Sequence, residues 1–206
     1  MNHLKTMGLF GIVAIAVGMV GINGVNASTL GIADTPKSDS GEKTSLLGHI
    51  IVTVTDSQGH IKAYRQTDNI VTNIGHDCAA NLLFGTGFAN CSSPAVFKYI
   101  AVTAATSVGT GTATDTTLSG ELTTNGLART SGTVTANQVA TGTTTSAIAQ
   151  VANTFTYSGT TAQSVAAAGL FDAASTGNMF AERAFGSAVT LNQNDQLTVQ
   201  WQITLS

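Results

Sequence analysis

Charged side chains are scarce in this chain. Asp, Glu, Lys and Arg make up 9% of its 206 residues, whereas an average soluble domain has about 25%. The formal net charge is −3, and the sequence shows no basic patch and no run of Arg interleaved with aromatic residues. A chain of this kind lacks the positive surface that holds a phosphate backbone, so nucleic acid is not an expected partner.

Aromatic residues are few as well. They make up 6% of the chain and include a single Trp. A secreted module that binds carbohydrate or a cell surface is expected to present a row of exposed rings, so their scarcity disfavours that function. Disorder is also disfavoured, because hydrophobic residues still reach 43% and strand patterns recur.

Catalytic and cofactor motifs are missing from the sequence. It contains no Gly-x-Ser-x-Gly elbow and no Gly-rich phosphate loop ending in Lys-Ser or Lys-Thr. Two carboxylate pairs, Asp115 with Glu121 and Asp172 with Asp195, lack the spacing of known calcium loops. We therefore expect a protein that is not an enzyme and that carries no cofactor and no metal.

Two sets of charged residues, Glu121 with Arg129 and Glu182 with Arg183, are interpreted as local ion pairs or as ladder positions of a sheet. Thr, Ser, Ala and Gly fill most other surface positions. Two explanations stay open for this neutral surface. Either the chain is a secreted β-domain coated with Thr and Ser, or much of its surface is buried against neighbouring subunits, where Lys and Glu are costly to desolvate.

The clearest pattern is present near the C-terminus. Between residues 196 and 205, apolar residues alternate with Thr and Gln. Successive side chains of a strand point to opposite faces. The alternation therefore predicts a long antiparallel strand whose apolar face, turned into the core, carries Leu197, Val199, Trp201 and Ile203.

Similar short patterns predict further strands at 96–103, 130–140, 146–157, 163–171, 179–185 and 188–191. A hairpin is expected over 46–66, and its outward-pointing Ile51 suggests that the first strand is covered on both sides. A short helix is predicted over 74–84, with Ala79, Leu82 and Leu83 on its buried side. Roughly eight to ten closely spaced strands are typical of an all-β fold. We expect an antiparallel β-sandwich, jelly-roll-like, with one short helix and an N-terminal extended arm.

Cys78 and Cys91 are the only cysteines of the chain. In an exported protein such a pair predicts a disulfide, here closing a loop of about 14 residues. A metal site would need more ligands than the neighbouring His76 and Asp77 supply. Asn90, followed by Cys91 and Ser92, matches the glycosylation sequon and is a candidate acceptor.

The first 27 residues have the features of a secretory signal peptide. Lys5 precedes an apolar run over 7–22, and small residues at 25–27 form a cleavage site. The run is short for a membrane span, which needs about 20 residues. We expect a secreted protein with no stable span after cleavage. In an alternative, type IV pilins keep such a segment as an assembly helix, but Gly11, Gly18 and Gly21 would weaken a long helix here.

Residues 28–45 are expected to form an arm and linker ahead of a β-sandwich domain over 46–206. The stretch 28–34 places Leu30 and Ile32 on one face of a short extended segment, and a flexible charged linker follows. A donor strand, which completes the sheet of a neighbouring subunit, has this pattern. A frayed terminus is the alternative.

Three stretches resemble those of known structural proteins: 99–102 with the Gly/Thr loop after it, 115–122 running on to 128–130, and 168–173 through 197–201. Together they resemble β-rich structural proteins of phage tails and virus-like particles. Exported subunits that polymerise into pilus-like threads by donating a strand are similar in build. The resemblance implies a β-rich fold and self-assembly.

The favoured hypothesis is a structural subunit of an extracellular filament or surface fibre. It would assemble head-to-tail by donor-strand complementation into a homopolymer, whose further contacts are cell surfaces or other filaments. The first alternative is a virion or phage-tail-like structural protein. The second alternative is the secreted carbohydrate- or cell-surface-binding module.

Overall fold

The computed structural model describes residues 45–85, 91, 95–108, 111–142 and 146–206. The predicted signal peptide, the arm with Leu30 and Ile32, and Asn90 lie outside the described residues. In chain order the elements are β1 (Leu46–Thr55), β2 (Ile61–Val71), α1 (Asn73–Phe84), β3 (Tyr99–Thr103), the 3-10 turn η1 (Thr106–Val108), β4 (Thr130–Ser131), β5 (Thr133–Gln138), β6 (Ala147–Thr156), β7 (Gln163–Phe171), β8 (Met179–Leu191) and β9 (Gln196–Leu205).

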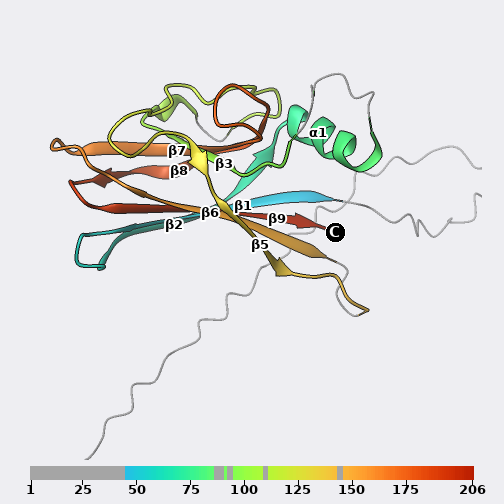
Figure 1. The fold of residues 1–206 in the computed structure, drawn as a ribbon, viewed down its shortest axis with the longest axis horizontal. Helices are drawn as coiled ribbons and strands as arrows, with labels where there is room; N and C mark the ends of the chain where they lie inside the picture. Colours follow the sequence, from blue (N-terminus) through green and yellow to red (C-terminus); the bar gives the residue numbers. More distant parts are fainter. Residues whose placement is uncertain (1–44, 86–90, 92–94, 109–110, 143–145) are drawn as a thin grey trace, which may run out of the picture. The chain divides into compact units, whose positions relative to one another are not determined.

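Nine antiparallel strands form one continuous sheet in the order β4-β3-β7-β8-β2-β1-β9-β6-β5 (Figure 1). The expected all-β antiparallel fold with one short helix is confirmed. The finer expectation of a jelly-roll-like sandwich is not, because hydrogen bonds join all nine strands. β4 and β5 end this order on opposite sides, although only Gly132 separates them in sequence. The sheet therefore curls back until its two ends meet at Gly132.

The hairpin of β1 and β2 links the two halves of this sheet. Its turn is held by Asp56, whose carboxylate accepts backbone N–H bonds from Gln58 at 2.8 Å and His60 at 2.9 Å. β2 pairs with β1 over most of its length and with β8 only at Ile70 and Val71. β2 therefore belongs to both halves of the sheet, and it connects the half around β9 to the half around β7.

The core lies between these two halves. β9 pairs with β1 on one side and β6 on the other, and its apolar side chains point into the core. Leu197, Val199 and Trp201 are fully buried, and Ile203 is 8% exposed. Ile100 of β3 and other buried residues of β7 and β8 belong to the same cluster, so the two halves share one core.

The segment from residue 179 to 191 forms a single strand, β8, where two short strands were expected. The two expected strands join at Gly186, whose φ is +80°. L-residues with a side chain rarely adopt such a φ. The pairing of β8 with β7 shifts register between Val165 and Ala167, so the strand bends without ending.

Helix α1 is capped at its N-terminus by Thr72, whose hydroxyl accepts a 2.9 Å hydrogen bond from the Gly75 N–H. It packs closely on β8, because a Cβ at Gly75 would lie 2.4 Å from the Phe180 carbonyl oxygen. The predicted buried side was wrong, since Leu82 and Leu83 are 51% and 67% exposed. The helix approaches the sheet through Gly75 and Cys78, which leaves the bulkier leucines outside. In the part of the chain that is described, no helix has the length and apolarity of a membrane span.

Candidate functional site

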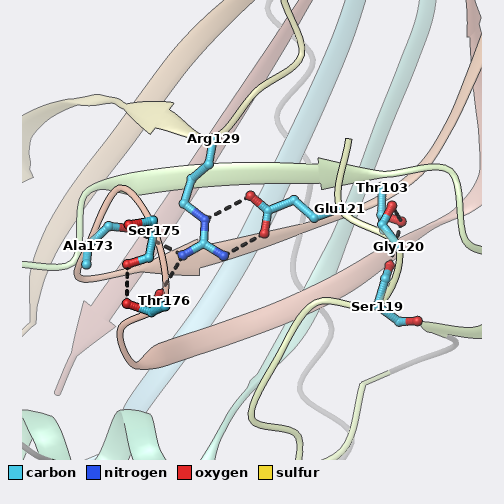
Figure 2. A network of polar contacts seen from close by, with 8 residues as sticks. All are labelled: Thr103, Ser119, Gly120, Glu121, Arg129, Ala173, Ser175 and Thr176. Atoms are coloured by element: carbon cyan, nitrogen blue, oxygen red, sulfur yellow. Dashed lines mark hydrogen bonds and ion pairs between the residues drawn. The ribbon is translucent and has the colours of Figure 1, made fainter. Parts of the chain in front are cut away.

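A partly buried cluster around Arg129 joins two connections of the sheet (Figure 2). Arg129 lies just before β4, and Glu121 lies where the chain forms a single bridge to Thr103. The guanidinium donates from Nε to Glu121 Oε1 at 3.0 Å and from Nη2 to Oε2 at 2.5 Å. The predicted pairing of Glu121 with Arg129 is therefore confirmed, as a bidentate ion pair.

The rest of the Arg129 guanidinium contacts the last residue of β7 and the loop between β7 and β8. Its Nη1 donates to the carbonyl of Thr176 at 2.7 Å and to that of Ala173 at 3.3 Å. Its guanidinium carbon lies 3.5 Å from the centre of the Phe171 ring, a cation–π contact. Each guanidinium nitrogen thus donates to a protein oxygen, and Arg129 acts as a clamp between two connections.

The adjoining turn is held by Thr103, which is fully buried. Its hydroxyl lies 2.7 Å from the Ser119 carbonyl and 2.8 Å from that of Gly120 (Figure 2). A pocket of about 310 Å³ opens beside the clamp. The charged side chains that line it, Glu121 and Arg129, already pair with each other, so the pocket presents no spare charge to a ligand. The cluster is suited to holding loops in place.

A second pair, of the buried Glu182 with the partly exposed Asp115, joins the loop around Asp115 to β8. Glu182 of β8 is 4% exposed, and burial, followed by hydrogen bonding to Asp115 and its charge, raises the pKa of Glu182 to about 8. The hydrogen bond from Glu182 is the main reason why the pKa of Asp115 lies below its usual value. At neutral pH the protonated Glu182 therefore donates to an ionised Asp115.

The other carboxylates that the sequence singled out have separate partners. Asp115 pairs with Glu182, and Glu121 pairs with Arg129. Asp172 accepts a hydrogen bond from Asn178, and Asp195 pairs with Lys62. Neither suspected carboxylate pair is brought together. Among the described residues, no group of three or more His, Cys, Asp or Glu side chains could hold a metal ion.

Glu182 and Arg183 are ladder positions of β8, opposite Gly169 and Ala168, and the alternative of a local ion pair between them is wrong. Adjacent residues of a strand point to opposite faces, so Glu182 turns to Asp115 while Arg183 donates to the Thr67 hydroxyl at 3.0 Å. No local pattern could have revealed the contact between Asp115 and Glu182, which lie far apart in sequence. The scarcity of charge was the available signal, because a buried carboxyl in such a chain has few partners to choose from.

The two cysteines are joined in the structure by a disulfide. Their Cα atoms lie 5.1 Å apart, and the sulfur of Cys78 is carried into the interior by α1. The bond ties α1 to Cys91. Asn81 adds a hydrogen bond of 3.3 Å to the carbonyl of Cys91.

The outward side of β2, β1, β9, β6 and β5 is a neutral surface, which we call the outer face. Strand register aligns its side chains in three rows: Tyr64-Thr53-Thr198-Thr154, then Gln66-Ile51-Gln200-Ala152-Thr133, then Asp68-His49-Gln202-Gln150-Thr135. The ionisable side chains in these rows are Tyr64, His49 and Asp68, and His49 Nδ1 lies 2.9 Å from Asp68 Oδ1. Such a surface is suited to contact with a neutral partner.

Comparison with known proteins gives one family. Residues 81–204 match the family model described as "Podophage GP4 fiber I protein gp80". The matched region runs from the last turn of α1 through nearly all of β9. No curated protein matches the chain. Because the match covers well over half of the chain, this protein belongs to the podophage GP4 fiber I protein gp80 family, and it resembles virion-type structural proteins of phages.

Proposed function

We propose that this chain is a structural subunit of a phage virion, and specifically of a fibre. The observation that carries the proposal is the family match over residues 81–204. It includes β3 to β9, which form most of the described sheet. As part of a virion, the subunit is extracellular once the particle is released, and its partners are other subunits of the same particle.

The geometry is consistent with a structural role. In the Arg129 clamp, Arg129 pairs with Glu121, and separately Glu182 pairs with Asp115. Each of these two pairs holds a loop against the sheet. The described part of the chain does not favour the binding module, because its strongly exposed aromatic side chains, Tyr64 and Phe84, lie on separate elements and form no row.

Purified virions test the proposal directly. Mass spectrometry should find the chain at a constant copy number per particle, and gold-labelled antibodies against it should mark fibres in electron micrographs. Particles made without the chain should lack the labelled fibre. If the chain is absent from purified particles, it is not a virion subunit.

A donor strand would be a more specific mode of assembly for the same role. Its support is the sequence pattern of residues 28–34, with Leu30 and Ile32 at period two. The family match favours the virion alternative over an exported filament. Deleting residues 28–34 tests the donor strand, since truncated copies that still assemble normally would contradict it.

Export by a signal peptide is a separate question with its own measurement. N-terminal sequencing of the chain taken from virions should begin at Ser28 if residues 1–27 are cleaved. A chain that retains Met1 would contradict the leader. Neither outcome changes the proposal of a virion subunit.

A further inference from the structure

The outer face is left partly uncovered by the described chain. Ile51, Gln200 and Gln202 at its centre keep intermediate exposure, and Tyr64 and Gln66 at one margin are exposed. Helix α1 packs on β8, in the other half of the sheet, and Figure 1 shows it on the β3, β7 and β8 side. Within the part of the chain that the structure describes, no helix lies over the outward side of β1, which carries Ile51.

The chemistry of the outer face fits a copy of itself. Gln side chains carry both a donor and an acceptor, and so do Thr hydroxyls, so two such faces can satisfy each other in either direction. The charged groups in the rows are confined to the His49–Asp68 pair at one margin. A face whose charged groups lie only at one margin repels its own copy little and does not attract a strongly charged partner.

The area is also sufficient for a stable pair. β2, β1, β9 and β6 are ten or eleven residues long and β5 is six. At about 3.3 Å per residue and about 4.8 Å between strands they cover roughly 700 Å² on each copy. That is close to the roughly 800 Å² that each partner contributes to a standard specific interface. Depletion of charge at the centre is typical of such interfaces.

We propose that two copies of this chain pair through their outer faces about a two-fold axis close to Gln200. Gln200 lies on β9, the middle strand of the five, and in the middle row between Ile51 and Ala152. In a two-fold interface the residues nearest the axis meet their own copies. The inference rests on the proposed function, since a fibre subunit needs contacts with other subunits.

A charge placed at the axis tests the pairing in the full-length chain. Sedimentation equilibrium of the wild-type protein should give twice the mass of one chain. Gln200→Lys and Gln200→Glu should each raise the dissociation constant roughly 100-fold or more, because like charges would meet across the axis. A mixture of the two variants in equal amounts should recover the dimer, with one Lys facing one Glu.

Thr190→Lys is the matched control. Thr190 is an exposed strand residue of β8, outside the outer face, so the same added charge should leave the mass unchanged. Circular dichroism and a melting temperature close to that of the wild type would show that all variants fold. Recovery in the Lys–Glu mixture excludes misfolding as the cause of dissociation.

Several results would overturn the proposal. They are a monomeric wild-type protein, a mass of three chains, or a dimer that survives Gln200→Lys. A dimer that appears only after residues 28–44 are deleted would show that the chain's own segment covers the outer face. Each of these outcomes leaves the detection of the chain in virions unaffected, so the two proposals can fail separately.

Discussion

Glu182 shows how one enclosed carboxyl can make stability depend on pH. Its pKa rises to about 8 mainly because β8 buries it. The unfolded chain gives up this proton near the ordinary pKa of 4.5. The folded chain therefore holds the proton more tightly, and the free energy of unfolding falls as pH rises from about 4.5 until it passes about 8.

Glu182→Gln should remove this pH dependence, because an amide keeps the hydrogen bond to Asp115 without ionising. We expect the variant to unfold with a free energy close to that of the wild type at pH 5. It should be more stable by roughly 4 kcal/mol at pH 9, because the pKa of Glu182 rises from 4.5 to about 8 on folding. Urea melts at the two pH values measure the difference, and a gap that is equal at both would contradict the shared proton. Glu121→Gln is not a suitable control, since Glu121 belongs to the Arg129 clamp.

The Arg129 clamp gives a second prediction at this scale. Arg129→Lys should cost roughly 1–3 kcal/mol, because an ammonium group cannot pair bidentately with Glu121 and stack on Phe171 at once. Arg65→Lys is the control, since Arg65 contacts one hydroxyl and one carbonyl at a more exposed position. We expect a change below about 0.5 kcal/mol there. If thermal melts show the same loss of stability for Arg129→Lys and Arg65→Lys, the contacts of the Arg129 clamp do not stabilise the fold more than those of Arg65.

At the scale of elements, β9 has one side in the core and the other side on the outer face. Trp201 is fully buried, while Gln200 beside it points outward with intermediate exposure. Trp201→Ala should cost about 3–5 kcal/mol, and Gln200→Ala well under about 1 kcal/mol. Chemical denaturation of both variants checks this, and similar losses would contradict the half-buried strand.

The disulfide acts on one element, α1 with the chain that follows it. Closing a loop of about 14 residues stabilises the fold by roughly 3 kcal/mol in the chain-entropy model. The double variant Cys78→Ser and Cys91→Ser should therefore melt several degrees lower, partly because Cys78 is fully buried. Free-thiol labelling of the unreduced wild type should modify neither cysteine. Labelling of both would show that the bond does not form in the native protein.

At the scale of the whole molecule, the sheet is closed at Gly132. The chain passes there from β4 at one end of the sheet to β5 at the other. A Cβ added at Gly132 would lie 2.9 Å from the Ala152 carbonyl oxygen. Gly132→Ala should therefore cost roughly 1–3 kcal/mol, because backbone has to move. Gly142→Ala is the control, since nothing lies within 4 Å of its added Cβ. Melting temperatures that fall equally in the two variants would contradict the close approach.

The sequence by itself determined the local features. Alternation predicted the buried face of β9 and the first hairpin, and the 3.6-residue period predicted a helix close to the span of α1. These features depend on neighbours in the chain, which periodicity and turn chemistry record. The charge pair of Glu121 and Arg129 was accessible for the same reason, because only eight positions separate the two residues.

Only the tertiary structure decided which distant segments meet. Strand pairing joined all nine strands into one sheet, Gly75 let α1 approach β8 and left Leu82 and Leu83 outside, and burial on β8 placed Glu182 against Asp115. These outcomes depend on backbone hydrogen bonds and desolvation between residues far apart in sequence. No local pattern encodes such contacts, because each becomes favourable only after the rest of the core has formed.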